Sequence, residues 1–333
     1  MAQRILLHIG AVKTGSSALQ SALVRNRDWL RSQGVLYPSD ASDADAQALK
    51  ITSGNGMKLA SALNPNLPFA KGYNAENAFN EAVHHATQTP EHTVLYSSEQ
   101  MSFLDPGKLQ EFNDVCQASG IELKVIFFFR NITEHAYSSY NQMVKRHLCT
   151  DSFGEFAKTR YFSRFAAITN GVTGVLGVPG FIAVNYDNVK SAIFGNFMRA
   201  IGIDPDGSEE MEERVNRSLS RIELEVMRVV NKSMTSEVDS KFVSDAIIYN
   251  NPEKRTEAAI SEEERDFLVQ KFRGQVNEVN GVLGAEVLTL ISDDVSVAEA
   301  DAVSLSEAES AYASMFSALY KRLLEMSKPP KKA

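Results

Sequence analysis

The sequence predicts a three-layer α/β/α fold, with a central and mostly parallel sheet covered by helices on both faces. Short apolar runs alternate with helical segments through residues 1–205, the order that a parallel sheet requires. The strongest runs are expected to form the centre of this sheet: 5–9, 93–97, 123–129 and 181–185. After residue 205 the pattern changes to helices and acidic loops, which predicts a helical C-terminal part.

The chain begins with a strand, a glycine-bearing loop and a helix. RILLHIG (4–10) is the strand, and SSALQSALVRNRDWLRSQG (16–34) has leucines at helical spacing before Gly34 ends it. VLYP (35–38) reads as a short strand closed by proline. Residues 39–72 are rich in small and polar residues, which predicts loops with a short helix.

The remaining elements continue the alternation. Asp105 and Pro106 are typical of a helix start, and IELKVIFFFR (121–130) is the strongest signal for a buried strand. The predicted elements in order are helix 74–88, strand 93–99, helix 105–120, strand 121–130, helix 132–148, strand 181–186 and helix 188–202. Later helices are expected within 214–234, 262–284 and 305–326. Because no repeat or Pro/Gly-rich linker interrupts them, we expect one domain over 1–333, with a nucleotide-binding core over 1–205 and a helical region over 206–333.

Composition excludes several classes of partner. The charges sum to 34 − 42 = −8, which disfavours a nucleic-acid-binding surface. No apolar stretch approaches the roughly 20 residues that span a bilayer, so no stable membrane insertion is expected. The first strand follows Met1 too closely for a signal peptide, and two cysteines in so long a chain are typical of reduced thiols. These observations predict a cytoplasmic globular protein.

The loop in HIGAVKTGSS (8–17) is typical of anion binding, because a strand–turn–helix places backbone N–H groups and a helix N-terminus around a phosphate. The pattern for nucleoside triphosphates, GxxxxGK[ST], needs a lysine after the second glycine, whereas Lys13 precedes Gly15. Hydroxyls that can hold a terminal phosphate stand at the mouth of the helix, in Thr14, Ser16 and Ser17. The alternative is an ordinary turn with a solvated lysine.

A second junction carries complementary groups. Arg130 ends the buried strand, at the sheet edge where α/β proteins gather their ligands. Ser138 lies two turns into the following helix, on a side that can face the same crevice. Together they offer charge-assisted donors and a hydroxyl to one phosphate. The alternative is an arginine that caps a strand and an exposed serine.

Both junctions together resemble the sulfotransferases that use 3′-phosphoadenosine 5′-phosphosulfate (PAPS). HIGAVKTGSS resembles the 5′-phosphosulfate loop PKTGTT, with Val12 for its proline and serines for its threonines. RNITEHAYSSY (130–140) resembles the 3′-phosphate motif, an arginine followed eight positions on by a serine, with Ile132 for the common proline. FIAVNYDNVKSAIFGNFMRAIGI and VNRSLSRIELEVMRVVN resemble later blocks of bacterial members, so the resemblance runs from about residue 4 to about residue 232.

The resemblance implies a core like that of P-loop kinases, PAPS as sulfuryl donor and no metal. Lys13 would face the bridging oxygen between phosphate and sulfate, whose developing negative charge an ammonium stabilises. The 5′-phosphate would be held by Thr14, Gly15, Ser16 and Ser17, and the 3′-phosphate by Arg130 and Ser138. Asn216 and Ser218 would close over the nucleotide.

The family places a histidine or glutamate base after the strand that precedes the 3′-phosphate strand, and TVLYSSEQM offers Glu99 there. A partly dehydrated carboxylate at this edge has a raised pKa that suits a base. Alternatively, Glu99 caps the next helix or pairs with a lysine. His8 is a second candidate base, although a hydrogen-bonded core histidine is the preferred interpretation.

The other polar and aromatic groups are expected to be solvated or to have packing roles. His135 is expected to face solvent. Lys145, Arg146 and His147, with Lys158, Arg160 and Arg164, line an anionic-substrate groove or, preferably, form solvated helix faces. The aromatic helix with Tyr312, Phe316 and Tyr320 is expected to pack or to form a contact in a homo-oligomer.

Two rival functions remain open at this point. A nucleotide kinase would need the lysine of the nucleoside-triphosphate loop and would depend on magnesium. A non-catalytic protein would bind the nucleotide without turnover. The acceptor is a small molecule or a glycan: the sequence leaves a sugar, a lipid headgroup and a small alcohol open. Its pocket is expected from residues 39–72, 140–175 and the C-terminal helices.

Overall fold

The computed structural model describes residues 3–10, 14–48, 52–67, 70, 74–209, 217–250, 258–291, 295–297, 312, 315–316 and 319. The chain divides into two compact units, which are described one at a time. The first takes in Met1–Arg130, Ser163–Val215 and Arg273–Thr289, and the second takes in Asn131–Phe162, Asn216–Phe272 and Leu290–Ala333. These units interleave along the chain, whereas the sequence predicted one internal boundary at residue 205. A single domain over 1–333 stays a prediction.

The first unit is built on a five-stranded sheet whose neighbouring strands are all parallel. Its order is β2-β3-β1-β4-β5, with β1 (Arg4–His8), β2 (Val35–Leu36), β3 (Thr93–Ser97), β4 (Glu122–Phe129) and β5 (Phe181–Asn185). The predicted parallel sheet is therefore confirmed, but the run 181–185, which was expected at its centre, forms the edge strand β5. The two-residue β2 and the half-buried β5 form its edges, so β3, β1 and β4 carry the fully buried strand positions.

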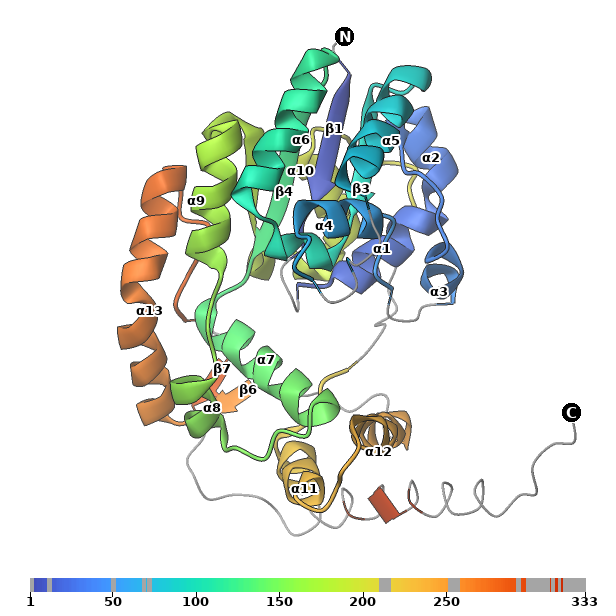
Figure 1. The fold of residues 1–333 in the computed structure, drawn as a ribbon. Helices are drawn as coiled ribbons and strands as arrows, with labels where there is room; N and C mark the ends of the chain where they lie inside the picture. Colours follow the sequence, from blue (N-terminus) through green and yellow to red (C-terminus); the bar gives the residue numbers. More distant parts are fainter. Residues whose placement is uncertain are drawn as a thin grey trace, which may run out of the picture. The chain divides into compact units, whose positions relative to one another are not determined.

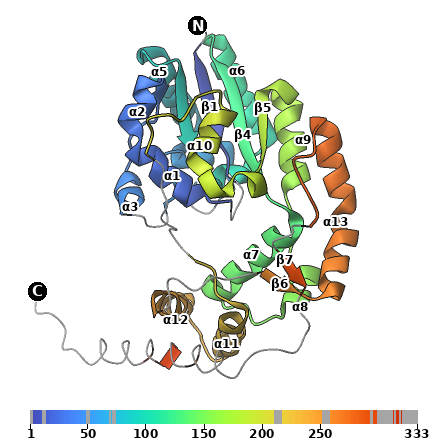
Figure 2. The same ribbon diagram turned by 180° about the vertical axis from the view of Figure 1, so that it is seen from behind.

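Helices cover both faces of this sheet. Side chains alternate along a strand, so Leu6 and Phe128 point to one face, where they pack with α1 (Ser16–Arg25), α2 (Arg27–Ser32) and α10 (Ile193–Ala200) (Figure 2). The opposite face is covered by α5 (Ala75–Gln88), α6 (Pro106–Ala118) and α9 (Phe165–Leu176) (Figure 1). The predicted three-layer arrangement is confirmed.

Shorter elements complete the first unit. These are α3 (Asp43–Gln47), α4 (Met57–Leu63) and the single 3₁₀ turns η1 (Glu99–Phe103), η2 (Val178–Gly180), η3 (Tyr186–Asn188) and η4 (Lys190–Ala192). The helix predicted over 16–34 is interrupted at Asn26, whose side-chain amide donates to the Ala22 and Glu209 carbonyls at 3.0 and 2.9 Å. A side chain that bonds nearby backbone in this way competes with the helix.

The second unit is mainly helical in the residues that the structure describes. It contains α7 (Ile132–Arg146), α8 (Phe153–Thr159), α11 (Arg221–Asn231), α12 (Glu237–Asn250) and a parallel pair of short strands, β6 (Ala258–Ile260) and β7 (Val295–Val297). The long α13 (Glu262–Leu283) begins in this unit and ends in the first. The helical character predicted after residue 205 is confirmed, but α12 and the strand pair were not expected.

The helix predicted over 305–326 falls largely outside the described residues. Its four described positions, Tyr312, Met315, Phe316 and Leu319, are helical. No helix in the described ranges is both long and apolar enough to span a bilayer. Cys116 and Cys149 are free and buried, and burial raises the pKa of the Cys116 thiol to about 12. The cytoplasmic location stays a prediction.

Candidate functional site

The strand order creates a topological switch point at the carboxyl ends of β1 and β4. From β1 the chain crosses towards β2 at one edge of the sheet, and from β4 it continues towards β5 at the other. Open α/β sheets bind ligands where the connections from two adjacent parallel strands lead to opposite edges of the sheet. The loop after His8 and the residue after Phe129 both reach this place, so the topology supports the two junctions that the sequence singled out.

The loop after β1 leads directly into α1. Gly15 stands immediately before the helix with φ of 71°, a left-handed conformation that favours glycine. Thr14 and Ser16 are buried and Ser17 is half-buried. Lys13, the residue predicted to face the leaving oxygen, lies outside the described residues together with Ala11 and Val12.

The loop folds back so tightly that its first glycine touches its first helical serine. A Cβ atom on Gly10 would lie 2.2 Å from Ser16 Oγ and 3.3 Å from His8 Cε1, so only glycine fits without a shift. Ser16 Oγ is buried and makes no hydrogen bond within the described part of the chain. A buried hydroxyl without a partner needs an explanation, and a ligand at the loop provides one.

The N-terminus of α1 is also electrostatically open to an anion. Its first turn has no acidic residue and no side-chain cap among the described residues. Helices α5, α6 and α11 begin with capping side chains from Asn74, Asp105 and Ser220, whereas α4, α9 and α10 resemble α1 in having no side-chain cap. Uncapped first-turn N–H groups and the positive end of the helix dipole favour a phosphate there. The residues present therefore fit the phosphate of a nucleotide.

Tyr186 links Arg130 to this loop, which the sequence did not reveal. The Arg130 guanidinium carbon lies 5.6 Å from the centre of the Tyr186 ring. The Tyr186 hydroxyl lies 3.3 Å from the position of a Cβ on Gly15, and Ile193 Cδ1 lies 2.7 Å from the same point. The structure thus brings Arg130 and the phosphate loop together around one aromatic ring. Tyr186 ends the FIAVNY segment, a position that the resemblance had covered without a role.

Ser138, the other predicted 3′-phosphate ligand, is half-buried on α7. Arg130 is the last residue of its stretch of the first unit, and α7 belongs to the second unit. The convergence of Arg130 and Ser138 on one phosphate therefore stays a prediction. Of the residues predicted to close over the nucleotide, Asn216 lies outside the described residues, and the Ser218 carbonyl accepts a hydrogen bond from Arg217 Nη1 at 2.9 Å.

Glu99 lies at the same sheet edge as the loop. Register pairs His8 of β1 with Ser97 of β3, and the Ser98 amide donates to the His8 carbonyl at 3.1 Å. Glu99 follows directly as the half-buried first residue of η1. Ser98, not Glu99, caps this turn: its Oγ accepts from the Gln100 amide at 3.3 Å. Strand register thus places the Glu99 backbone at the carboxyl ends of β1 and β3, and the role of its carboxylate as a base stays a prediction.

His8 belongs to a buried network beneath the loop. Its Nδ1 shares a hydrogen bond of 2.8 Å with Ser97 Oγ, which also accepts from Gln20 Nε2 at 3.2 Å. The rings of Phe128 and Phe197 pack edge-on against the imidazole. Burial lowers the pKa of His8 to about 3, so it is neutral near pH 7. The preferred prediction of a core histidine is confirmed.

Two predictions of solvated side chains were wrong. His135 is buried, and its Nδ1 shares a hydrogen bond of 2.9 Å with the Tyr161 hydroxyl. Lys145 is buried as well, with its Nζ 3.4 Å from the Arg217 carbonyl. Both residues lie on α7, which contacts α11 and α12, and Tyr161 lies against His135, so tertiary packing buries polar positions that the apolar pattern of α7 does not mark.

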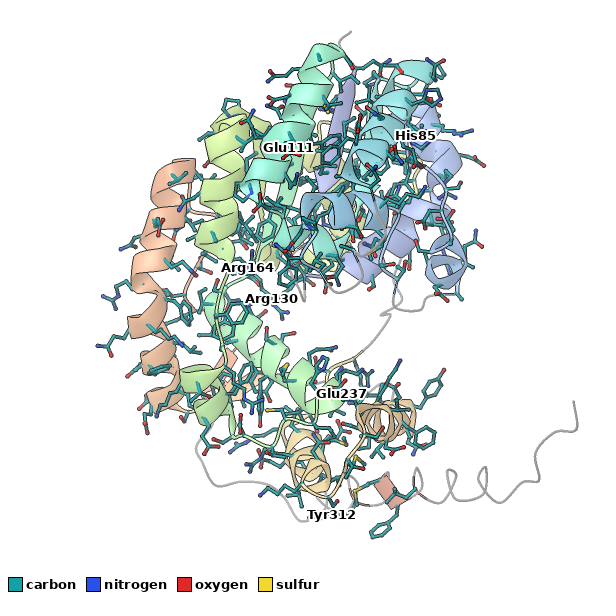
Figure 3. The ribbon with its side chains drawn as sticks, viewed as in Figure 1. His85, Glu111, Arg130, Arg164, Glu237 and Tyr312 are labelled. Carbon is teal, nitrogen blue, oxygen red and sulfur yellow. The ribbon has the colours of Figure 1, made fainter. Side chains whose placement is uncertain are left out.

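The remaining members of the proposed basic groove have separate partners. Arg146 pairs with Asp245, His147 with Glu237, Lys158 with Glu263 and Arg160 with Asp151. Arg164 differs, because it precedes α9 in the first unit and its guanidinium carbon lies 5.0 Å from the centre of the Phe103 ring. Its Nε is buried and makes no hydrogen bond within the described residues. Phe165 lies against Phe129, so Arg164 and Arg130 stand at the same sheet edge (Figure 3).

No group of three or more histidine, cysteine, aspartate or glutamate side chains that could hold a metal ion occurs among the described residues. The prediction that the reaction needs no metal stays a prediction, because a magnesium ion can also be held by a nucleotide.

Comparisons with known proteins give one structural similarity. The fold resembles the crystal structure of a sulfotransferase from Alicyclobacillus acidocaldarius, with a TM-score of 0.45 and 14% sequence identity over 86% of this chain and 97% of that chain. A similarity at this level carries no argument about activity, so the assignments below rest on the geometry of the chain and its motifs. No protein-family model matches the chain, and no curated protein matches its sequence.

Proposed function

We propose that the protein is a sulfotransferase that moves a sulfuryl group from PAPS to a hydroxyl group. The observation that carries the proposal is the loop before α1. Among the described residues, the helix N-terminus has no side-chain cap and the buried Ser16 hydroxyl has no hydrogen-bond partner, and Tyr186 lies against both Arg130 and Gly15. This is a site for a nucleotide that carries more than one phosphate. The order of the two sequence motifs favours PAPS among such nucleotides.

In the proposed reaction, the acceptor oxygen attacks sulfur in line as Glu99 takes its proton. The bond between sulfur and the bridging oxygen breaks, and its electron pair stays on the phosphate of adenosine 3′,5′-bisphosphate. The ammonium of Lys13 would stabilise that charge. The 5′-phosphate would be bound by Thr14, Gly15, Ser16 and Ser17, and the 3′-phosphate by Arg130 and Ser138. No metal takes part in the proposed step.

The donor site is tested by calorimetric titration of adenosine 3′,5′-bisphosphate beside ATP with magnesium. We expect the bisphosphate to bind more tightly than magnesium-ATP, and Arg130→Ala to weaken it by at least tenfold, because one charge-assisted contact contributes about 1.5–3 kcal/mol. Arg273→Ala, an exposed arginine on α13, is the matched control and should bind like wild type. A preference for magnesium-ATP would overturn the proposal and favour the kinase.

The catalytic roles are tested by transfer of labelled sulfate from PAPS to a panel of sugars, lipid headgroups and small alcohols. Glu99→Gln and Lys13→Met should each lower turnover by about 10²-fold or more, with nucleotide binding retained for Glu99→Gln. Glu286→Gln changes an exposed carboxylate and serves as the control. Tight bisphosphate binding without transfer to any acceptor would support the non-catalytic alternative. Full turnover in both variants would show that the roles are wrongly assigned.

A further inference from the structure

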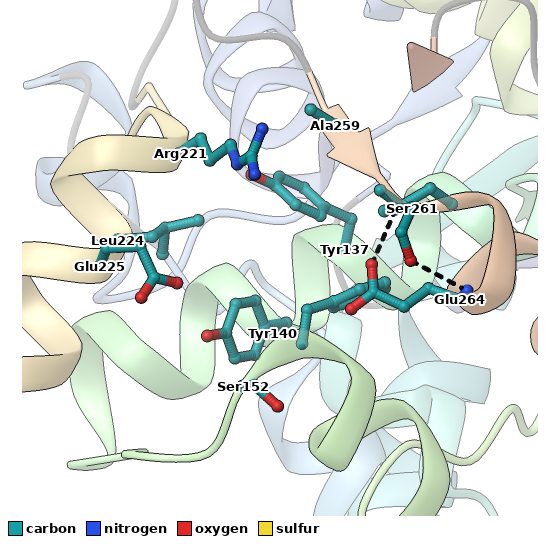
Figure 4. Close-up of a pocket in the computed structure, with 11 residues that line it drawn as sticks. Tyr137, Tyr140, Ser152, Arg221, Leu224, Glu225, Ala259, Ser261 and Glu264 are labelled. Carbon is teal, nitrogen blue, oxygen red and sulfur yellow. Dashed lines mark hydrogen bonds between the residues drawn. The ribbon is translucent and has the colours of Figure 1, made fainter. Parts of the chain in front are cut away.

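A cavity of about 250 Å³ lies within the second unit, formed by α7, the start of α8, α11, and the segment from β6 into α13 (Figure 4). Polar groups in its wall are matched by their own neighbours. The Tyr137 hydroxyl interacts with the Ala259 backbone. Glu225 pairs with Arg228 at 2.6 Å. The cavity therefore gives no argument for a charged ligand, and a charged group without a partner is found in the first unit instead.

Arg164 leaves its hydrogen-bond donors unused, unlike two other half-buried arginines of the first unit. Arg4 donates to Thr93 Oγ1 at 2.9 Å, and Arg27 donates to both carboxylate oxygens of Asp43 at 2.9 Å. Arg164 is also half-buried, and its Nε is fully buried, yet it makes no hydrogen bond and no ion pair within the described residues. A guanidinium that is partly removed from water normally has such partners, so its unused donors need an explanation.

Packing holds this guanidinium at the carboxyl edge of the sheet. Arg164 immediately precedes α9, and the next residue, Phe165, packs against Phe129 at the end of β4 with ring centres 5.6 Å apart. The guanidinium carbon of Arg164 lies 5.0 Å from the centre of the Phe103 ring. An aromatic ring attracts a guanidinium without using its N–H groups, which remain available to an oxyanion.

Arg164 lies on the Glu99 side of this edge rather than on the side of Tyr186. Phe103 is the last residue of η1, the turn that Glu99 begins after β3. Arg130 instead lies against Tyr186, which follows β5. The strands β3 and β5 lie on opposite sides of the β1–β4 pair, so the two arginines occupy separate positions. Four steps along a 3₁₀ turn cover about 8 Å, a span that one small acceptor molecule can bridge from Glu99 to Arg164.

The surroundings of Arg164 favour an oxyanion. The first turn of α9 has no acidic residue, and the positive end of the helix dipole lies there. The side chains that bond to this turn are neutral: Ser163 Oγ accepts from the Phe165 amide at 3.3 Å, and Gln275 Nε2 donates to the Ser163 carbonyl at 3.1 Å. A guanidinium presents a fork of N–H groups that matches a carboxylate or a phosphate.

We propose that Arg164 binds the acceptor, and that the acceptor carries an oxyanion, either a carboxylate or a phosphate, in addition to the hydroxyl that receives the sulfuryl group. This inference rests on the proposed function, in which Glu99 takes the proton from that hydroxyl. The oxyanion meets the N–H groups of Arg164 while the hydroxyl lies at Glu99. Arg164 thus selects sugar acids, sugar phosphates and hydroxy acids over neutral sugars and alcohols.

The test is calorimetric titration of acceptors onto the full chain saturated with adenosine 3′,5′-bisphosphate, which needs no turnover. Glucuronate, 6-hydroxyhexanoate and glucose 6-phosphate carry an oxyanion, and glucuronamide, 6-hydroxyhexanamide and glucose are their neutral counterparts. We expect at least one charged acceptor to bind at least tenfold more tightly than its counterpart, as one charge-assisted contact predicts. The pair with the larger ratio shows whether the oxyanion is a carboxylate or a phosphate.

Two failures of this titration have different meanings. Equal binding within every pair, or no binding of any charged acceptor to the bisphosphate complex, would overturn the inference and leave the proposed function standing. Failure of the bisphosphate itself to bind would overturn the proposed function and the inference together.

Arg164→Ala separates acceptor binding from a structural role. The preference for the charged acceptor should disappear, while binding of its neutral counterpart and of the bisphosphate should change less than twofold. Arg164→Lys keeps the charge without the fork and should keep part of the preference. Arg199→Ala is the matched control, because this exposed arginine on α10 donates to the neutral Asn196, and it should keep the full preference.

Two results with Arg164→Ala would refute the role given to this residue. A lowered melting temperature with an unchanged preference for the charged acceptor would show that Arg164 is structural. A tenfold loss of bisphosphate binding would show that its guanidinium binds the donor instead of the acceptor.

Discussion

Gly10→Ala is the most direct test of the phosphate loop, because the structure gives the size of the conflict. The new Cβ would stand 2.2 Å from Ser16 Oγ, at least 0.8 Å (3.0 − 2.2) closer than Cβ atoms come in real structures. Ser16 Cβ and His8 Cε1, at 3.2 and 3.3 Å, are tight but tolerable. The serine hydroxyl must therefore rotate away from the mouth of the loop.

If Ser16 donates to the nucleotide, this rotation removes one charge-assisted hydrogen bond. Such a bond contributes about 1.5–3 kcal/mol, so Gly10→Ala should weaken adenosine 3′,5′-bisphosphate by between about tenfold and 150-fold. Overpacking should also lower the free energy of unfolding by about 1–3 kcal/mol. Titration calorimetry and urea unfolding measure the two effects separately.

A double-mutant cycle identifies the cause of the loss. Ser16→Ala removes the hydroxyl directly, so Gly10→Ala combined with Ser16→Ala should bind no more weakly than Ser16→Ala alone and should recover part of the stability. Gly174→Ala is the control, because its Cβ meets nothing within 4 Å in the last turn of α9, and it should stabilise the protein by up to roughly 0.5–1 kcal/mol. Wild-type affinity in Gly10→Ala, or additive losses in the cycle, would refute the role given to Ser16.

Three further predictions concern His8, Tyr186 and the buried ion pair of Arg217 and Glu223. The pKa of His8 is lowered from 6.5 to about 3, so as pH falls the unfolded chain binds a proton on this histidine before the folded chain does. The free energy of unfolding should therefore drop by about 2 kcal/mol between pH 6.5 and about pH 5. In urea unfolding, His8→Gln should lack this part of the pH dependence. Tyr186→Leu removes the ring under Arg130. It should weaken binding of adenosine 3′,5′-bisphosphate severalfold, while binding of ATP at the loop changes little. Equal weakening of both nucleotides would contradict the stacking role. Arg217 and Glu223 form a bidentate ion pair with N···O distances of 2.8 and 3.0 Å, and their side chains are 5% and 1% exposed. Arg217→Met should lower the free energy of unfolding by about 3–5 kcal/mol, because it leaves the Glu223 carboxylate buried without its partner. Replacing both residues by methionine should cost much less.

Local patterns were sufficient to predict the sheet and most of its helices. Apolar runs at 5–9 and 121–130 can only be buried strands in an alternating chain, and Asp105 with Pro106 starts α6 where the capping rule places it. The same patterns predicted that the loop at 10–17 and Arg130 share one sheet edge, since parallel strands end on the same side. The sequence did not predict the break at Asn26, because the Glu209 carbonyl that shares its side chain lies 183 residues away.

By itself, the sequence determined the residue types at the loop and at the ends of β3 and β4, because periodicity and glycine spacing are local properties. Only the tertiary structure decided which of these groups meet. Tyr186 came to lie under Arg130, Gly10 came to lie against Ser16, and His135 and Lys145 became buried, since each outcome depends on which helices and strands pack across the chain. The cavity around Tyr137 was likewise decided by the tertiary structure. Its lining comes from segments more than a hundred residues apart, and no pattern within a single helix records the charges that another helix will place beside it.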